Sequence, residues 1–474
     1  MSRINTNVGA LTAQRGLNRS QKSLNDTLQR LSSGLRINRG ADDPAGLIAS
    51  EGLRSEISGI SQAIDNSQRA SNVIATAEGA LNEVAALLLN VKDLVVEAAN
   101  RGAISDDEIA ANQLQIDSAI KSITRIANTT TFAGLKLING SLDYVTSGIN
   151  TSDLTAVNIT AANFGTTTNI PVSVDVVTSA QTAELQFRAS ATTAPVTLEI
   201  AGNDGVEVLS FGSNTSVADI LTAVNSVADS IGVQAEYINS ANPNSGITFT
   251  SRGYGTRNFV SVEAKSGAFA TTDVDGNART RDEGQDDVPT VNGALAVGDG
   301  RNVKLNTATL DVELTLAETF GVGSTSFAIT DGGALFQLGP QVTTNQQVNI
   351  AIQSVAASNL GDDEVGFLSD IQTGGLAALR TDASKASQII EKAIRQVSLV
   401  RGRLGAFEKN TLQTNMSSLQ IALENVTASE SSIRDADFAE ETARLTRAQI
   451  LTQAGTSVLA TANVTPQNVL SLLQ

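Results

Sequence analysis

The sequence predicts an α+β protein in which long terminal helices enclose an inserted β-rich region. Near both ends, apolar residues repeat in alternating steps of three and four over several heptads, a spacing typical of coiled coils. Residues 45–170 and 341–465 contain no proline, so long helices can run there uninterrupted. Between about residues 145 and 333 the chain is instead rich in Gly, Thr, Ser and Asn, with short alternating runs that are typical of strands.

The N-terminal helices follow from their apolar spacing and end signals. The first stripe consists of Leu17, Leu24, Leu28, Leu31 and Leu35. In "ADDPAG", Asp43 can cap a second helix whose first position is Pro44. Its seam runs from Ile60 to Ala98, and "NRGA" ends it near Gly102. "ISDDE" then opens a third helix with the seam Ile109, Ile116, Ile120 and Ile123.

The C-terminal part of the chain repeats this spacing. One seam contains Ala386, Ile390, Ala393, Val397, Val400, Leu404 and Phe407. A shifted face follows with Leu412, Met416, Leu419, Leu423 and Val426, consistent with a stutter or with a helix buried on two sides. The last stripe consists of Leu451, Ala454, Val458, Leu459, Ala462, Val469 and Leu473. The two terminal stripes would be exposed unless the chain ends pair, and pairing would cover only one side.

The middle of the chain predicts β-rich modules. Runs such as "VTLEIAG", "GITFTSRG" and "LDVELTLAE" alternate in polarity between Gly and Asn turns. Among them, "VADILTAVNSVADSIG" at residues 217–232 has a helical period and a glycine stop. The modules interrupt a helical hairpin, so the two ends of the insertion must lie close together.

Composition restricts the function. The net charge of −17 and the pI near 4.5 argue against nucleic acid and anionic membranes as partners, because both require a basic surface. No apolar run is long enough to insert into a membrane, and the start lacks the apolar stretch of a secretory signal. The chain has no Cys and no His, which removes thiol and imidazole chemistry. We therefore expect no enzyme, cofactor or metal site.

The acidic clusters have an ordinary structural explanation. "ADDPAG", "DDE" at 106–108 and "DGNARTRDEGQDD" at 275–287 lack the spacing of a calcium-binding loop. We interpret them as solvated turns and helix caps, and the pair Glu440 and Glu441 as surface.

The combined pattern predicts self-association. Four long seams that contain few aromatic residues and flank a β insertion are difficult to close within one compact monomer. Packing between subunits is more economical, and a heterologous contact that does not close builds a filament.

Several strings resemble bacterial flagellin. They are "LQRLSSGLRINRGADDPAGL", "EGALNEV", "VSLVRGRLGAFEKN" and "SSIRDADFAEETARLTRAQILTQAGTSVLATANVTPQNVLSLLQ". The resemblance covers about residues 1–142 and 334–474. It implies a subunit of the flagellar filament that is exported through the flagellar type III apparatus without a cleaved signal peptide and is located outside the cell. The implied partners are further copies of the chain, a secretion chaperone, the filament cap and the hook-junction protein.

The resemblance also implies three domains. Residues 1–43 and 434–474 would form the inner coiled coil, and residues 44–145 and 334–433 a helical bundle with a β-hairpin in "FQLGPQVTTNQQVNIAI". Residues 146–333 would form the surface-exposed variable region. Near 196–265 this region resembles the module named for an Ile-Asn pair, although Val224 and Asn225 stand at the pair.

Site residues are assigned on the same basis. For the inner coiled coil we expect Leu17, Leu24, Leu28, Leu31, Leu35, Leu451, Val458, Leu459, Val469 and Leu473. For bundle packing we expect Ile74, Leu81, Leu88, Val397, Leu404 and Leu423. Candidate polar contacts between subunits are Arg30, Arg36, Asp42 and Asp43, which would otherwise only cap and solvate a turn. Flagellins sensed by the innate Toll-like receptor have an Arg where this chain has Asn90, while Leu94 is kept, so we expect weak activation.

Other functions are open at this point. A hook–filament junction protein of the same family would share the terminal helices without polymerising indefinitely. An extracellular adhesin would use the β modules to bind host surfaces or glycans, and a carboxylate-based hydrolase has little support. For a filament subunit, deleting the residues after Pro466 should leave the β modules folded and weaken or abolish polymerisation.

Overall fold

The computed structural model describes residues 6–165, 167–307, 309–363 and 365–471, with side chains described as far as residue 464. The chain forms two compact units. The first contains the segments up to Ala70, Gln337–Gln346 and from Lys409 onward, and the second contains Ser71–Phe336 and Gln347–Glu408. Among the described residues, no helix is long and apolar enough to cross a membrane.

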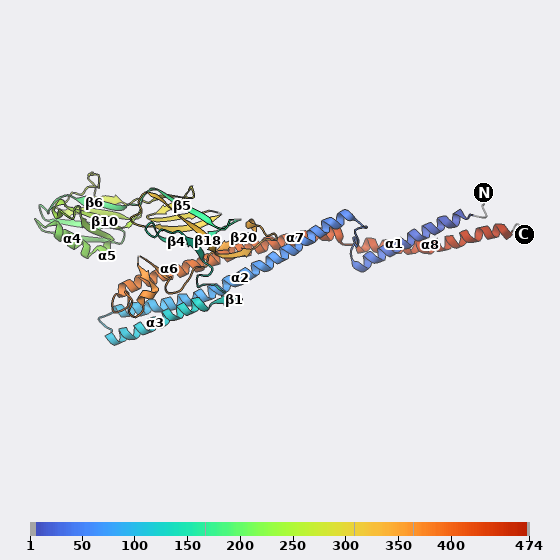
Figure 1. Cartoon of the computed structure of the whole chain (residues 1–474), viewed down its shortest axis with the longest axis horizontal. Helices are drawn as coiled ribbons and strands as arrows, with labels where there is room; N and C mark the ends of the chain where they lie inside the picture. The colour runs from blue at the N-terminus through green and yellow to red at the C-terminus, as the bar shows by residue number, and fades with distance from the viewer. Residues whose placement is uncertain (1–5, 166, 308, 364, 472–474) are drawn as a thin grey trace. The chain divides into compact units, whose positions relative to one another are not determined.

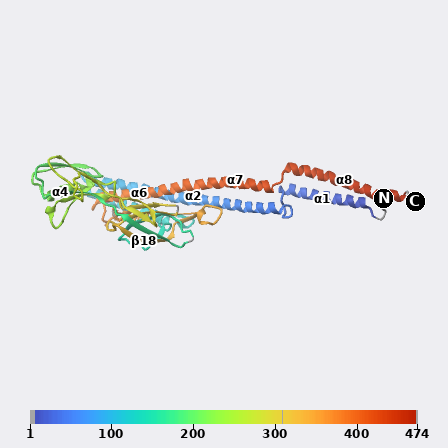
Figure 2. The same ribbon diagram turned by 90° about the horizontal axis from the view of Figure 1, so that it is seen from above.

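The first unit is built from helices that pair along their length. They are α1 (Val8–Ser33), the start of α2 (Pro44–Ala99), α7 (Thr414–Arg434) and α8 (Phe438–Ser471). Figures 1 and 2 both show α1 beside α8. The two helices are antiparallel, because Asn7 at the start of α1 donates to the carbonyl of Ala462 and Arg30 near its end pairs with Glu441.

The segment that follows α1 pairs with the segment that follows α7. Gly34 ends α1 with φ of +73°, a left-handed conformation that favours glycine. Leu35 then forms an antiparallel bridge with Asp435, and the N–H of Arg36 donates to Arg434 O at 2.7 Å. Asp43 accepts a hydrogen bond from Gly46 N at 2.9 Å, directly before Pro44 opens α2. The predicted cap of this helix is therefore present.

The loop Gln337–Gln346 contacts α2 in the first unit. A Cβ built on Gly59 would lie 3.0 Å from Cβ of Pro340, so a larger residue would push the loop slightly away from α2. On α7, Asn415 donates to the carbonyl of Leu338 at 2.8 Å. This loop joins β19 (Ala334–Gln337) to β20 (Gln347–Ile350) and includes the 3-10 helix η2 (Thr344–Gln346). The predicted hairpin is confirmed.

The second unit begins with a helical bundle. It contains the later part of α2 together with α3 (Asp106–Thr129) and α6 (Ala383–Phe407). The helices bury one stripe each, consisting of Ile74, Leu81, Leu88 and Val95 on α2, Ile109, Ile116, Ile120 and Ile123 on α3, and Ile390, Val397 and Leu404 on α6. Ser105 and Glu108 form a capping box at the start of α3. Aliphatic side chains in heptad steps thus form the core of the bundle.

Short strands and a 3-10 helix accompany the helices of the bundle. They are β1 (Thr131–Phe132), β2 (Leu135–Lys136), β21 (Gly361–Asp362), β22 (Gly366–Phe367) and η3 (Leu368–Ile371). The buried amide of Gln113 on α3 donates to Ile371 O at 2.8 Å and accepts from Leu379 N at 2.9 Å. A π-helical turn, η4 (Glu408–Gln413), links α6 to α7.

The first β module packs two antiparallel sheets around one core. One sheet has the order β14-β13-β5-β18-β3 and the other the order β15-β16-β17-β4. The strands are β3 (Tyr144–Ser147), β4 (Leu154–Ala162), β5 (Ile170–Thr178), β13 (Val288–Val291), β14 (Ala294–Leu295), β15 (Val297–Asp299), β16 (Asn302–Asn306), β17 (Leu310–Leu316) and β18 (Gly323–Gly332). Val174 and Phe327 from one sheet and Val312 and Leu314 from the other belong to the same buried cluster.

The second β module lies within the chain between β5 and β13. Its sheets have the orders β12-β11-β7-β8 and β6-β10-β9. The elements are β6 (Thr182–Phe187), β7 (Val196–Ala201), β8 (Val206–Phe211), α4 (Val217–Ser226), α5 (Ala228–Ile231), β9 (Val233–Tyr237), η1 (Pro243–Ser245), β10 (Ile247–Tyr254), β11 (Phe259–Ser266) and β12 (Arg281–Glu283). Its core combines Ile220 and Val224 of α4 with Phe249 and Val262 of the sheets.

The α+β class is confirmed, with one local difference. The predicted helix over 217–232 is divided into α4 and α5 at Val227. Asn225 explains the arrangement, because its side chain accepts from Ala235 N at 2.8 Å and donates to Ala235 O at 3.0 Å. The last turn of α4 is thereby attached to strand β9.

Candidate assembly surface

The α1–α8 pair is held by a salt bridge at one end. Arg30 Nη1 lies 3.1 Å from Glu441 Oε1, and Arg444 Nη1 lies at the same distance from that oxygen. Glu441 is only 4% exposed. The earlier interpretation of the pair Glu440 and Glu441 as surface is therefore wrong for Glu441, because this carboxylate faces α1 while Glu440 remains exposed.

The contact between the two helices depends on small residues. Ala448 and Thr27 are buried. A Cβ built on Gly455 would lie 3.3 Å from Cδ1 of Leu17, so the missing side chain lets the helices approach closely. Thr452 and Leu459 are half-buried along α8. The packed face of α8 thus follows steps of three and four residues through Ala448, Thr452, Gly455 and Leu459.

Another side of the α1–α8 pair is apolar and exposed. The exposed fractions are 47% for Leu28, 63% for Ile450, 50% for Leu451 and 56% for Val458. Leu451 and Val458 follow Ala448 and Gly455 by three residues and therefore project from a flank of the packed face. On α1, Leu17, Leu24 and Leu31 are half-buried, as is Leu35 directly after this helix. The predicted coiled-coil residues are thus divided between a covered and an open side.

Two of the predicted coiled-coil positions are not described at side-chain level. Val469 belongs to the range of α8, but its side chain lies outside the described residues. Leu473 lies outside them entirely.

The polar residues after α1 are engaged within the chain. The guanidinium of Arg36 donates to Ile433 O through Nε at 3.1 Å. Asp42 accepts from the backbone N–H groups of Arg39 and Asn38, which hold the pKa of Asp42 below its ordinary value. Together with the Asp43 cap, these bonds fix the turn. A role for Arg30, Arg36, Asp42 and Asp43 between subunits stays a prediction.

The predicted bundle residues separate into two groups. Ile74, Leu81, Leu88, Val397 and Leu404 are at most 1% exposed, and all five belong to the second unit. Leu423 differs, because it is half-buried on α7 in the first unit, and α7 has no buried residue among those described. Figures 1 and 2 show α2 beside α7, and one neighbouring helix covers only one side of it. Leu423 is therefore not a core residue of this chain.

The residue at the receptor-related position lies on the bundle surface. Asn90 is exposed on α2, beside Leu89, which is 54% exposed, and Leu94 is half-buried. Asn90 is thus accessible in the second unit.

Sequence reasoning missed the small residues of the helix contact. Ala448, Thr452 and Gly455 form the packed side of α8, whereas the sequence pattern weighted Leu and Val. A usable signal was present, because these small residues repeat at the same heptad steps as the apolar stripe.

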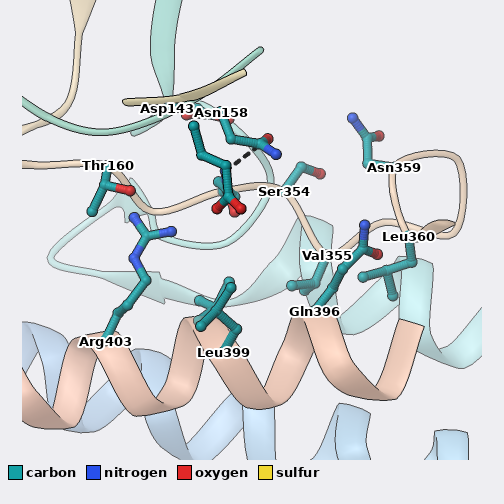
Figure 3. Close-up of a pocket in the computed structure, with 13 residues that line it drawn as sticks. Asp143, Asn158, Thr160, Ser354, Val355, Asn359, Leu360, Gln396, Leu399 and Arg403 are labelled. Carbon is teal, nitrogen blue, oxygen red and sulfur yellow. Dashed lines mark hydrogen bonds between the residues drawn. The ribbon is translucent and has the colours of Figure 1, made fainter. Parts of the chain in front are cut away.

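A polar cavity of about 190 Å³ lies between α6 and the first β module. In Figure 3 Arg403 projects from α6 toward Asp143 and Thr160, while Gln396 projects toward the loop with Leu360 and bonds to the backbone of Gly361. Burial raises the pKa of Asp143 and lowers that of Arg403. A guanidinium facing carboxylates can hold the β module on the bundle electrostatically, and the lining offers neither thiol nor imidazole to serve as a nucleophile or base.

Comparisons with known proteins agree with the helical architecture of the two ends of the chain. The bacterial flagellin N-terminal helical region matches residues 4–143, the C-terminal helical region matches 387–473, and the flagellin hook IN motif matches 197–253. The last match contains Asn225 and its bonds to β9.

Curated relatives match along nearly the full length. A flagellin of Salmonella rubislaw is 30% identical over 507 residues, covering 99% of this chain and 99% of the relative. A B-type flagellin of Pseudomonas aeruginosa is 29% identical over 525 residues with the same coverage. A solved flagellar hook associated protein-3 from Legionella pneumophila covers 81% of this chain at 13% identity with a TM-score of 0.31, a value at which no detailed superposition follows.

An antiparallel pair of terminal helices, a heptad-packed bundle and two inserted β modules accompany these full-length matches. The chain therefore belongs to the bacterial flagellin family and is a structural subunit of the flagellar filament that serves motility.

Proposed function

We propose that the α1–α8 pair is the element through which this filament subunit assembles with further copies of itself. The observation that carries the proposal is the exposed apolar flank of the pair. Leu451 and Val458 are at least 50% exposed, although their helix already has a partner on its other side. Monomeric proteins rarely leave apolar side chains in such a row, and continuous apolar faces mark interaction sites.

Burial of this flank supplies a driving force for assembly. Removing a Leu or Val side chain from water contributes about 1.5–3 kcal/mol. Each subunit repeats the same flank, so a heterologous contact between copies would extend along a helical filament. In this proposal Leu17, Leu24, Leu28, Leu31, Leu35, Leu451, Val458, Leu459, Val469 and Leu473 contribute to the inner coiled coil.

The division into three domains is part of the proposal. Residues 1–43 and 434–474 would form the inner coiled coil, residues 44–145 and 334–433 the bundle, and residues 146–333 the exposed region. The polar turn with Arg30, Arg36, Asp42 and Asp43 would contribute contacts between subunits. The helices on the two sides of this turn have different partners, because α1 pairs with α8 and α2 lies beside α7. This difference supports a domain boundary at the turn.

Export and accessory partners follow from family membership. We infer export without a cleaved signal peptide from membership of the flagellin family. A secretion chaperone, the filament cap and the hook-junction protein are the inferred partners during export and growth. The role is structural rather than enzymatic, with no cofactor, nucleic acid or membrane insertion involved.

Seeded polymerisation of purified monomer tests the assembly surface. The double variant Leu451→Ser with Val458→Ser removes exposed apolar groups without touching the face that packs on α1. We expect unchanged monomer helicity by circular dichroism and shorter or absent filaments by electron microscopy. Ala460→Ser, an exposed position on the opposite side of the same helix from Leu451 and Val458, is the matched control and should polymerise normally.

The outcome also separates the alternative functions. Long uniform filaments of the unaltered chain support a filament subunit. Discrete short assemblies would favour a junction protein, and an absence of assembly would favour an adhesin. Normal filaments from the double variant would refute the proposed surface while leaving the family assignment intact.

A further inference from the structure

The two β modules are joined by two chain crossings. The first crossing runs from β5, which ends at Thr178, to β6, which starts at Thr182. The second runs from β12, which ends at Glu283, to β13, which starts at Val288. Gln181 in the first crossing forms an antiparallel bridge with Gln285 in the second. Because the chain connects the two modules at these adjacent segments, a change in the orientation of one module relative to the other must bend them.

Asp286 ties a turn of each module to the second crossing. One carboxylate oxygen of Asp286 accepts from Gly300 N at 2.7 Å and from Thr256 N at 3.1 Å, and the other accepts from the Thr256 hydroxyl at 2.6 Å. Thr256 follows β10 of the second module, and Gly300 follows β15 of the first. The two turns lie close together, because a Cβ built on Gly255 would be 2.7 Å from Gly300 Cα. Asp286 therefore acts as a clamp between the modules.

The next residue, Asp287, differs from Asp286 in its burial and its hydrogen bonding. Asp287 is 3% exposed, and among the described residues neither of its carboxylate oxygens has a hydrogen-bond partner. Its Oδ1 lies against the backbone of Gly298, since a Cβ built there would be only 2.0 Å away. An ionised carboxylate without a donor is costly to bury, and such a group takes up a proton instead.

The surrounding charges do not compensate an ionised Asp287. Asp286 and Asp299 both act on it as like charges. Arg257, which lines the same corner as Gly298 and Asp299, is paired with Asp299 at 3.0 Å. On the adjoining strands Lys304 pairs with Glu313 at 3.0 Å. At the same corner the Arg301 guanidinium lies over the ring of Tyr254, whose hydroxyl donates to Glu318.

We propose that Asp287 makes the junction between the two β modules a proton-operated hinge, closed while its carboxyl group is protonated and loosened when it ionises. Ionisation places a third negative charge beside Asp286 and Asp299 at a position that is itself only 3% exposed. Separating the turns that hold Thr256 and Gly300 admits water to this charge. Burial, followed by the charges of Asp286 and Asp299, raises the pKa of Asp287 to about 7. The hinge therefore responds near neutral pH, and it belongs to the monomer, independently of filament assembly.

The test measures the distance between the modules as a function of pH. The full chain has no cysteine, so Ser152→Cys in the first module and Ser240→Cys in the second, both exposed, introduce two unique sites for spin labels. Pulsed electron spin resonance between pH 5 and 9 then reports the distance distribution. We expect a narrow distribution at pH 5 that broadens through neutral pH, and a distribution in Asp287→Asn that stays narrow at every pH.

Two further variants control for the change in net charge and for the effect of the neighbouring charge. Asp275→Asn, at an exposed aspartate of the second module, changes the net charge equally and should broaden as the unaltered chain does. Asp299→Asn removes a like charge that raises the pKa of Asp287, so Asp287 should ionise at lower pH and the broadening should shift below pH 7. A distribution that does not change with pH, or one that changes equally in Asp287→Asn, would overturn the hinge.

Discussion

Arg30 Nη1 lies 3.1 Å from Glu441 Oε1 and joins two helices that are separated by 411 residues in the sequence. The carboxylate is 4% exposed and the guanidinium side chain 26%. This pair sets the register of α1 against α8. The register in turn determines which side chains remain exposed outside the α1–α8 contact.

The first prediction concerns this salt bridge. Arg30→Ala should weaken the α1–α8 pairing by about 1–2 kcal/mol, because it leaves a buried carboxylate with Arg444 as its remaining partner. Thermal unfolding of the monomer followed by circular dichroism measures the loss. Arg19→Ala, at an exposed position of the same helix, is the control, and equal melting temperatures for the two variants would refute the expectation.

The second prediction compares two leucines of the predicted bundle. Leu81 is completely buried, whereas Leu423 is half-buried on α7. Leu81→Ala should reduce the free energy of unfolding by about 2–5 kcal/mol, because it removes contacts and leaves a cavity. Leu423→Ala should cost less than about 1.5 kcal/mol, because its site is already partly hydrated. Denaturant titration of both monomers gives the values, and a reversed order would contradict the assigned burial.

The third prediction concerns Asn225 in the second β module. Asn225→Ala removes two hydrogen bonds to the backbone of Ala235. We expect a loss of about 1–2 kcal/mol, since the β9 backbone groups are left unpaired. Hydrogen exchange should increase in α4 and β9 and stay unchanged in the helical bundle. Thr222→Ala, at an exposed position of α4, provides the comparison, and protection that matches the unaltered chain would count against the role of Asn225.

The fourth prediction is a dependence of stability on pH. The pKa of Asp287 is raised to about 7 in the folded chain, so between pH 4 and 7 the folded state binds this proton and the unfolded state releases it. The free energy of unfolding should therefore fall as the pH rises through this window, by at most about 4 kcal/mol, and the contribution should stay lost above it. Asp287→Asn lacks this loss, so the difference between the two unfolding curves isolates it. A constant difference between pH 4 and 8 would exclude the effect.

The fifth prediction concerns receptor sensing. Asn90 is exposed on α2 at the position where receptor-sensed flagellins have an Arg. We expect weak activation of the innate receptor in a reporter-cell titration, and stronger activation by Asn90→Arg, which restores a cationic group. Lys92→Ala is not a suitable control, because Lys92 pairs with Glu391 at 3.0 Å. Asn82→Arg, at an exposed position of the same helix before this segment, should leave the response unchanged, and full activity of the unaltered chain would refute the expectation.

Much of the helical part could be predicted from local pattern. The cap at Asp43 and the start of α2 at Pro44 depend on a few neighbouring residues, so they were identified directly. The buried stripe through Ile74, Leu81 and Leu88 follows from the heptad spacing, because a seam that long must be covered. By contrast, spacing alone does not reveal how many neighbours a helix has, which is why the heptad pattern predicts a core position at Leu423 although none of the described residues of α7 is buried.

Local sequence is sufficient to predict which segments are helical, which are β-rich, and that apolar faces near both ends require partners, because these properties depend on residues a few positions apart. The tertiary structure decided which side of α8 is covered. It selected the side with Ala448 and Gly455, where close approach is possible, and left Leu451 and Val458 exposed. It also brought Arg30 to Glu441 and buried Asp287 beside Asp286 and Asp299. These contacts join residues that are distant in the sequence or depend on burial, and no local pattern specifies either.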